Sequence, residues 1–339
     1  MNDRGIAIIG GGALGSAWAV NLAKRLRVSL LVRSQEVADA ITAAGENIRY
    51  LPNVAIPSDV TVTVDWDEAL ANCELILIAT PANAFGEVLA NVDLRCRKIP
   101  VVWCSKGFCP VSGEPLSLEA ERILGPDACY GVLSGPSFAE GIAANDPTAV
   151  VVATNSGHQR TLGIAEFLSN ESLRVYANSD LIGVQVCGVI KNVYAIAAGI
   201  IDGCGWGVNT RAAMVTRAIA EAKRYLESYP SMESTLMGLA GFGDIYLTCS
   251  SRVSRNYQVG LGLASGKPLA VIVEGLGHVA EGIHSARLIH KRATGLGIDM
   301  PLVAAVNAVL DGVHTPRECA TALMARDVKY EKSLISDDD

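Results

Sequence analysis

Short apolar runs rich in β-branched residues alternate with longer helical patterns through the first half of the chain. The runs that predict strands are 5–9, 29–32, 74–79, 100–104, 130–134, 148–153 and 173–177. Strands that alternate with helices are typical of βαβ units, in which helices cover both faces of a parallel sheet. The pattern therefore predicts an α/β fold with a doubly wound, Rossmann-like sheet, whose ligands bind beyond the carboxyl ends of the strands.

The second half of the chain changes character near residue 179, where strand patterns give way to helical periodicity. Asn178, Ser179 and Asp180 offer side chains that can cap a helix just before an apolar stretch. Because a chain of 339 residues has room for two domains of about 100 to 200 residues, we expect two. They are a Rossmann-like domain at 1–179 and an all-helical domain at 180–339.

Composition and charge narrow the classes of function. Half of the residues are apolar, and 28 Lys and Arg residues against 35 Asp and Glu residues give a formal charge of −7. Without a basic cluster to follow a phosphate backbone, nucleic acid is not an expected partner. The apolar stretch 181–201 contains Gln185, Lys191 and Asn192, which indicates a buried helix and not a membrane span.

The cysteines and the N-terminus bear on the cellular setting. Nine cysteines are scattered singly, without a C-x-x-C pair or histidines at metal-ligand spacing, so we expect reduced thiols and no metal site. The chain starts with Met1 and runs directly into a predicted strand, without the apolar region of a secretory signal. A cytoplasmic protein is expected.

A glycine-rich loop follows the first predicted strand. Gly10, Gly12 and Gly15 fit the pattern G-x-G-x-x-G directly before a predicted helix. Gly10 permits the tight turn, Gly12 lets the backbone approach a pyrophosphate, and Gly15 allows the helix to pack on the strand. The helix N-terminus then faces the anion. The loop predicts a dinucleotide site, against the simpler alternative of a glycine-rich turn without a ligand.

The end of the second strand bears on the choice of cofactor. NAD-specific proteins usually carry an acidic residue there, whereas this chain has Arg33 followed by Ser34. A guanidinium can bind a 2′-phosphate in a bidentate way, and the serine can add a hydrogen bond. These residues favour NADP over NAD, although Arg33 can also be read as a solvated surface residue.

Lys191 is the most unusual residue of the second half. It lies in the apolar stretch, where an ammonium is costly unless it is paired or used in chemistry. Gly188, three positions earlier, lies on the same helix face and leaves space for a small substrate. We interpret Lys191 as a catalytic residue, and a structural ion pair is the alternative.

Two further groups of residues suggest a substrate site. Asp244 and Thr248 are spaced i, i+4 and so share a helix face, where Asp244 can orient a lysine. Arg255 and Asn256, a few residues on, can hold a phosphate. Lys106 follows the fourth predicted strand, and Gly135, Pro136, Ser137 and Phe138 follow the fifth, so both segments are expected to face the cofactor cleft.

Together these segments resemble the bacterial NAD(P)-dependent glycerol-3-phosphate dehydrogenase family. The resemblance runs from the glycine loop to at least residue 282. It is carried by ordered motifs at 47–52 (NIRYLP), 105–107, 134–139 (SGPSFA), 182–185, 191–193, 209–213, 241–248, 254–256 and 279–282.

The resemblance implies an activity and roles for individual residues. The activity is the reversible, NAD(P)H-dependent reduction of dihydroxyacetone phosphate to sn-glycerol 3-phosphate, which supplies phospholipid synthesis. Lys191 would be the general acid and base, and a homodimer is implied. The substrate contacts implied are Lys106, Gly135, Ser137, Lys191, Asp244, Ser254, Arg255 and Asn256. The cofactor contacts implied are Ala13, Leu14, Arg33, Lys106, Ala139, Arg255, Val279 and Glu281.

Other interpretations remain open at this point. Ala13 and Leu14 depart from the hydroxyl and aromatic residues common in that loop, and the segment 204–208 is also unusual, which leaves room for a paralogue with a related phosphorylated ketone as substrate. A β-hydroxyacid or ketopantoate-type dehydrogenase shares the same plan but would take a carboxylate. A non-catalytic NAD(P)H sensor would explain the glycine loop but not Lys191.

Overall fold

The computed structural model describes residues 4–96, 98–276, 280–328 and 330. Its contacts divide the chain into two compact units, Met1–Gln185 and Val186–Asp339, and the division falls inside helix α8 (Leu181–Gly203). Asp180, at the start of this helix, accepts a hydrogen bond from the Gly183 backbone N–H at 2.7 Å.

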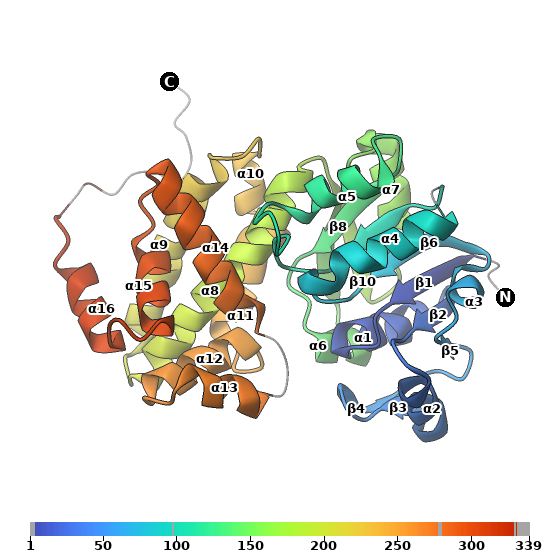
Figure 1. Cartoon of the computed structure of the whole chain (residues 1–339), viewed down its shortest axis with the longest axis horizontal. Coiled ribbons are helices and arrows are strands. Elements are labelled where there is room, and N and C mark those ends of the chain that lie inside the picture. The colour runs from blue at the N-terminus through green and yellow to red at the C-terminus, as the bar shows by residue number, and fades with distance from the viewer. Residues whose placement is uncertain (1–3, 97, 277–279, 329, 331–339) are drawn as a thin grey trace. The chain divides into compact units, whose positions relative to one another are not determined.

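The first unit is built on an eight-stranded sheet in the order β10-β9-β8-β7-β6-β1-β2-β5 (Figure 1). Its strands are β1 (Gly5–Ile9), β2 (Arg27–Leu31), β5 (Thr61–Thr63), β6 (Cys73–Ile78), β7 (Val101–Trp103), β8 (Tyr130–Ser134), β9 (Thr148–Thr154) and β10 (Leu173–Asn178). A two-stranded hairpin of β3 (Glu46–Asn47) and β4 (Leu51–Ala55) stands apart from the sheet. The seven predicted strands are all present, whereas β3, β4 and β5 were not predicted.

Helices join the strands of this unit. They are α1 (Ala13–Leu22), α2 (Gln35–Ala44), α3 (Trp66–Leu70), η1 (Ala82–Ala84), α4 (Phe85–Cys96), α5 (Leu116–Leu124), α6 (Ala139–Ala144) and α7 (Gly157–Leu168). β1 and β6 are neighbours in the sheet. From β1 the chain continues to β2, toward the β5 edge, and from β6 it continues to β7, toward the β10 edge. Because such crossovers are right-handed, α1 and α4 cover opposite faces of the sheet. The direction reverses between β1 and β6, which is where doubly wound sheets bind ligands.

One strand pairing departs from the expected parallel sheet. β8 pairs with β9 antiparallel, while β9 and β10 pair parallel to each other. The connection from β8 to β9 contains only the six-residue helix α6, which is about 9 Å long. β9 runs back alongside β8 and does not cross over to the far end of the sheet. The fold class, a mostly parallel Rossmann-like sheet with a helical C-terminal unit, is confirmed.

The core of the first unit follows from the apolar runs. Ile8, Leu30 and Leu77 on neighbouring strands are fully buried, and Trp18 of α1 packs in the same cluster. Buried side chains of this size contribute roughly 1.5 to 3 kcal/mol each relative to exposure. The strands therefore form a rigid platform, from whose carboxyl ends the loops project.

The described part of the second unit, 186–276, 280–328 and 330, contains helices and no strands. Beyond α8, its elements are α9 (Val208–Leu226), α10 (Glu233–Leu236), the π-helix η2 (Leu239–Gly243), α11 (Asp244–Ser250), α12 (Arg255–Ala264), α13 (Leu269–Leu276), α14 (Glu281–Leu296), α15 (Pro301–Leu310) and α16 (Pro316–Met324). The helical periodicity predicted at 211–226 and 281–294 corresponds to α9 and α14.

Helix α8 packs closely against α12. A Cβ atom at Gly199 would lie 2.0 Å from the Tyr257 carbonyl oxygen, and one at Gly260 would lie 2.1 Å from the Ile196 carbonyl oxygen. Only glycine permits this approach of two backbones. Among the described residues, α8 is also the one helix long and apolar enough to cross a membrane, but its apolar window is wholly buried inside the protein. That burial is typical of a core helix.

The cysteines are mostly buried. Cys104, Cys109, Cys129, Cys249 and Cys319 are buried free thiols, and Cys204 is partly exposed. Burial raises the pKa of both Cys104 and Cys249 to about 12. These two thiols therefore stay protonated and neutral at physiological pH.

Candidate active site

The glycine loop lies between β1 and α1 and has the geometry of a phosphate cradle. Gly10 has a φ of +119°, which L side chains rarely adopt. A Cβ at Gly15 would lie 1.9 Å from the Gly10 carbonyl oxygen, so glycine is required there as well. By contrast, a Cβ at Gly12 would meet nothing within 4 Å. Gly12 begins α1 without a side-chain cap, and the first turn holds no acidic residue.

This arrangement fits a dinucleotide. The N–H groups of the first helical turn have no intrahelical partner and carry partial positive charge. Because the side of the loop beside Gly12 is open, an anion can approach them closely. Ala13 and Leu14, in that first turn, are partly buried and can contribute backbone amides only.

Arg33 and Ser34 follow β2, the neighbour of β1, with Val32 between the strand and Arg33. The Gly10 N–H donates to the Leu31 carbonyl oxygen at 2.9 Å, so the glycine loop and the end of β2 lie side by side. Arg33 is exposed, and Ser34 stands at the N-terminus of α2 without using its side chain as a cap. Both side chains are thus available beside the loop.

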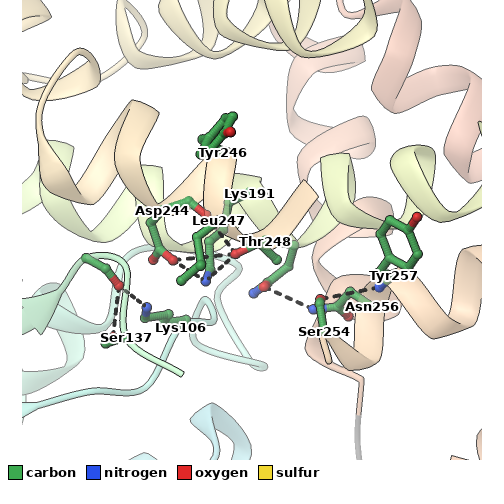
Figure 2. Close-up of polar contacts among 12 residues, drawn as sticks. Lys106, Ser137, Lys191, Asp244, Tyr246, Leu247, Thr248, Ser254, Asn256 and Tyr257 are labelled. Carbon is green, nitrogen blue, oxygen red and sulfur yellow. Dashed lines mark hydrogen bonds and ion pairs between the residues drawn. The ribbon is translucent and has the colours of Figure 1, made fainter. Parts of the chain in front are cut away.

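Lys106, Gly135 and Ser137 come together in the first unit, as Figure 2 shows for the two side chains. The Lys106 Nζ donates to the Gly135 carbonyl oxygen at 3.2 Å, and the Ser137 Oγ donates to the same oxygen at 2.9 Å. Gly135 has a φ of +134°, which again favours glycine. The segment after β7 and the segment after β8 therefore present one ammonium and one hydroxyl side by side.

The second unit brings Lys191, Asp244 and Thr248 together (Figure 2). The Lys191 Nζ lies 2.6 Å from the Asp244 Oδ1 and 2.9 Å from the Thr248 Oγ1. All three residues are buried, with exposed fractions of 6%, 0% and 2%. Asp244 and Thr248 come from one face of α11, whereas Tyr246 points away from the cluster and is 61% exposed.

The hydrogen bonds of this cluster can be assigned by elimination. The Thr248 hydroxyl gives its proton to the Asp244 carbonyl oxygen, at 2.7 Å. Its lone pairs must therefore accept from the lysine, because an ammonium can only donate. Lys191 is thus held by a carboxylate and a hydroxyl, which compensate its charge in an apolar helix. Cys249, beside Thr248, adds no charge because its thiol stays protonated.

Ser254, Arg255 and Asn256 form the start of α12. The Ser254 side chain caps the helix by accepting from the Tyr257 N–H at 3.3 Å. Arg255 is exposed and Asn256 is buried. The Asn256 Nδ2 donates to the Asn192 Oδ1 at 3.0 Å, and its Oδ1 accepts from the Gly282 N–H at 3.0 Å.

Asn192 was not among the predicted site residues, although its position next to Lys191 was a signal that could have found it. Its contact with Asn256 links α8, α12 and the start of α14. Glu281, the first residue of α14, and Ala139, the first residue of α6, are both partly buried at helix N-termini. Val279 lies outside the described residues.

Comparisons with known proteins agree on one family. The family model of the NAD-dependent glycerol-3-phosphate dehydrogenase N-terminus matches residues 5–159, and that of the C-terminus matches residues 180–321. The chain belongs to this family. A glycerol-3-phosphate dehydrogenase [NAD(P)+] from Dechloromonas aromatica is 44% identical over 326 residues, which cover 96% of this chain and 99% of that protein.

Two more members of the glycerol-3-phosphate dehydrogenase family show the same relation. The enzyme of that name from Methylibium petroleiphilum is 45% identical over 96% of this chain and 98% of its own. The crystal structure of glycerol-3-phosphate dehydrogenase from Coxiella burnetii superposes with a TM-score of 0.89 at 36% identity, covering 95% of this chain and 99% of that one. The family predicted from the motifs is confirmed, and the ketopantoate-type alternative is set aside.

Proposed function

We propose that this chain catalyses the reversible reduction of dihydroxyacetone phosphate to sn-glycerol 3-phosphate with NAD(P)H. The observation that carries the proposal is the buried cluster in which Asp244 and Thr248 hold the Lys191 ammonium at 2.6 and 2.9 Å. Such a group is expensive to bury and is suited to proton transfer. The choice of this particular reaction rests on membership of the glycerol-3-phosphate dehydrogenase family.

In the proposed mechanism Lys191 acts as the general acid. As the C2 carbonyl gains a hydride, its oxygen becomes an alkoxide, and the Lys191 Nζ donates a proton to it. Asp244 and Thr248 keep the ammonium oriented during this transfer and compensate its charge. In the reverse direction the neutral amine takes the proton from the C2 hydroxyl.

The second unit is proposed to hold the phosphate of the substrate. Arg255 and Asn256 at the start of α12 would bind its phosphate, the first through its charge and the second through its amide. Binding energy from the phosphate would fix the carbonyl in a reactive position. Within the first unit, Lys106 and Ser137, which share the Gly135 carbonyl oxygen, are proposed as substrate contacts that offer a positive charge and a hydroxyl.

The first unit is proposed to hold the cofactor, as the NAD(P)-binding domain, and the second to be the substrate and catalytic domain. When bound, NAD(P)H supplies the hydride. The open side of the glycine loop at Gly12 and the uncapped start of α1 fit its diphosphate. Arg33 and Ser34 favour NADP, and the further contacts proposed are Lys106, Ala139, Arg255, Val279 and Glu281.

The cellular role proposed is that of a soluble cytoplasmic enzyme, working as a homodimer, which supplies glycerol phosphate for phospholipid synthesis. The reduced, buried thiols are compatible with a reducing compartment. Size-exclusion chromatography with light scattering would test the dimer.

The activity is tested by mixing the purified protein with dihydroxyacetone phosphate and following the oxidation of NADPH and NADH in parallel. Unphosphorylated dihydroxyacetone and ketopantoate serve as control substrates. We expect oxidation only with the phosphorylated ketone. Turnover of ketopantoate would overturn the proposed substrate, and NADPH binding without any turnover would instead support a sensor.

The role of Lys191 is tested with Lys191→Ala. We expect kcat to fall by about 10²-fold or more, the range of general acid catalysis, with partial recovery when ethylamine is added to replace the lost amine. Lys223→Ala is the matched control, because Lys223 is also an ion-paired lysine of the second unit, 2.5 Å from Glu233. A Lys191→Ala enzyme that folds, binds NADPH and keeps kcat within tenfold of the wild type would exclude the acid role.

A further inference from the structure

A buried asparagine supports the glycine loop from behind. Asn47, the last residue of β3, is 3% exposed. Its Nδ2 donates to the Gly11 carbonyl oxygen at 2.9 Å and to the Ser16 Oγ at 2.8 Å. Both acceptors lie more than thirty positions earlier in the chain. The two N–H groups of one carboxamide are therefore both directed at the loop and the first turn of α1.

The first of these hydrogen bonds fixes the direction of a peptide group. In a trans peptide the C=O and the following N–H point in opposite directions. While Asn47 holds the Gly11 carbonyl oxygen on the inner side of the loop, the Gly12 N–H must point away from Asn47. Rotation of this peptide would otherwise cost little, because glycine restricts its backbone less than any other residue.

The second hydrogen bond ties the loop to the helix that follows it. Ser16 is fully buried, and its N–H donates to the Gly12 carbonyl oxygen at 3.0 Å in the first turn of α1. Asn47 thus bonds at once to the peptide before Gly12 and to the residue that closes the first turn after it. The loop and the helix N-terminus are held in one fixed arrangement.

We propose that Asn47 is a positioning residue for the diphosphate of the dinucleotide. It keeps the Gly12 N–H and the first amides of α1 directed toward the open side of the loop, so the ligand does not pay to order them. The inference rests on the proposed function, since it names the residue that prepares the cofactor site. It makes Asn47 part of the site without contact with the ligand.

The test compares two buried asparagines of the same unit. Asn47→Leu removes both donors and keeps the number of side-chain heavy atoms. Asn21→Leu is the matched control, because Asn21 of α1 is 2% exposed and donates to Asn145 at 3.0 Å and Ser172 at 3.1 Å, away from the glycine loop. For each variant, the Kd of NADPH is measured by fluorescence titration, and Tm, kcat and both KM values are recorded.

We expect Asn47→Leu to raise the Kd and the KM of NADPH by about tenfold, the loss of roughly one well-placed hydrogen bond. Its kcat and its KM for dihydroxyacetone phosphate should stay within about threefold of the wild type. Asn21→Leu should lower Tm but leave the Kd of NADPH unchanged. Equal losses of NADPH affinity in the two variants would reduce Asn47 to a structural residue and overturn the proposal.

A second variant covers the case in which Asn47→Leu does not fold. Asn47→Asp keeps the shape but cannot donate when ionised, and it places a charge against the Gly11 carbonyl oxygen. Its Kd for NADPH should rise by at least about tenfold relative to the wild type, and an unchanged Kd would also overturn the proposal. If the wild type itself binds no NADPH, the proposed function fails and this inference fails with it. If the wild type binds NADPH and the Asn47 variant binds it equally well, only this inference fails. The two failures are therefore distinguishable.

Discussion

The N-termini of α1 and α15 both present backbone N–H groups that have no acceptor within their own helix. The two helices differ in what is available to accept from these groups. Neither N-cap residue, Gly12 in α1 or Met300 in α15, caps the helix with its side chain. In α15 the carboxyl group of Glu221, from α9, takes that place. The Glu221 Oε1 accepts from the Leu302 N–H at 2.6 Å, and its Oε2 accepts from the Val303 N–H at 3.3 Å.

The difference separates a structural helix terminus from one prepared for a ligand. The first amides of any helix favour an anion. At α15 the chain provides the acceptor itself, in a carboxyl group that is 1% exposed. At α1 the described part of the chain provides none, and the space beside Gly12 stays open. An open terminus therefore indicates a site only together with the family membership and the glycine loop.

The largest effect is expected when α1 is given an anion of its own. Gly12→Asp is compatible with the fold, because Gly12 has a φ of −80° and a Cβ there meets no atom within 4 Å. The new carboxylate would cap the helix and repel the diphosphate. Like charges placed together cost several kcal/mol, so we expect the Kd of NADPH to rise by about 10³-fold, or roughly 4 kcal/mol.

Gly12→Ala is the control for this variant, since it adds a Cβ without charge. Its Kd should rise much less than that of Gly12→Asp. Thermal unfolding should show Gly12→Asp to be as stable as the wild type or slightly more stable, because Asp is a good N-cap residue. An aspartate variant that binds NADPH normally would show that α1 does not hold the diphosphate.

The next largest effect is expected when α15 loses its carboxyl acceptor. Glu221→Ala leaves the Leu302 and Val303 N–H groups without their acceptor in the protein interior and opens a small cavity. We expect a loss of about 3 kcal/mol in the free energy of unfolding at pH 5.5, measured by urea denaturation. NADPH affinity of the folded variant should not change. Loss of affinity without loss of stability would contradict the comparison.

A smaller effect is expected from the ionisation of Glu221. Burial raises the pKa of this carboxyl from 4.5 to about 7, opposed by the backbone N–H groups of Leu302 and Val303 and by Arg224, and increased by Asp299. A raised carboxyl pKa means that the folded state binds the proton more tightly than the unfolded state. This contribution to stability is therefore present below pH 4.5 and is lost as the pH rises through 7.

Between pH 5 and 7 the loss should amount to about 2 kcal/mol, since one pKa unit corresponds to about 1.4 kcal/mol. Urea denaturation at several pH values would measure it. Glu221→Gln has no ionisable group at this position and so lacks this pH-dependent contribution to stability. The difference in the free energy of unfolding between wild type and variant should therefore change by about 2 kcal/mol between pH 5 and 7. A constant difference would show that Glu221 does not titrate in this range.

The sequence predicted the fold best where apolar runs are continuous. β1 and β8 begin and end at the predicted residues, and both are buried along their whole length. The direction of β9 was missed because an apolar run carries no information on strand direction. The hairpin β3–β4 and the edge strand β5 were missed because they are short and partly exposed, with little periodicity.

For the site, the sequence predicted contacts within one helix better than contacts across the chain. The shared face of Asp244 and Thr248 follows from their i, i+4 spacing. The contact of Asn47 with the glycine loop spans more than thirty residues and has no local signal. Glu221 did have a local signal in the sequence, because its spacing places it on the buried stripe of Met214, Ala218 and Tyr225 on α9. The argument that singled out Lys191, a charged residue among apolar ones, applies equally to Glu221.

The smallest effect is expected where a side chain adds to the backbone site at α1. Arg33 is exposed beside the glycine loop, and we expect it to bind the 2′-phosphate that distinguishes NADP from NAD. Arg33→Ala should therefore raise the Kd of NADPH by about tenfold, or roughly 1.4 kcal/mol, and leave that of NADH within about twofold. Fluorescence titration with both cofactors at low and high salt measures the two changes, with Arg49→Ala, another exposed arginine of this unit, as the control. If both affinities fall together, Arg33 acts on the shared diphosphate, and the recognition of that group is not left to the backbone of α1 alone.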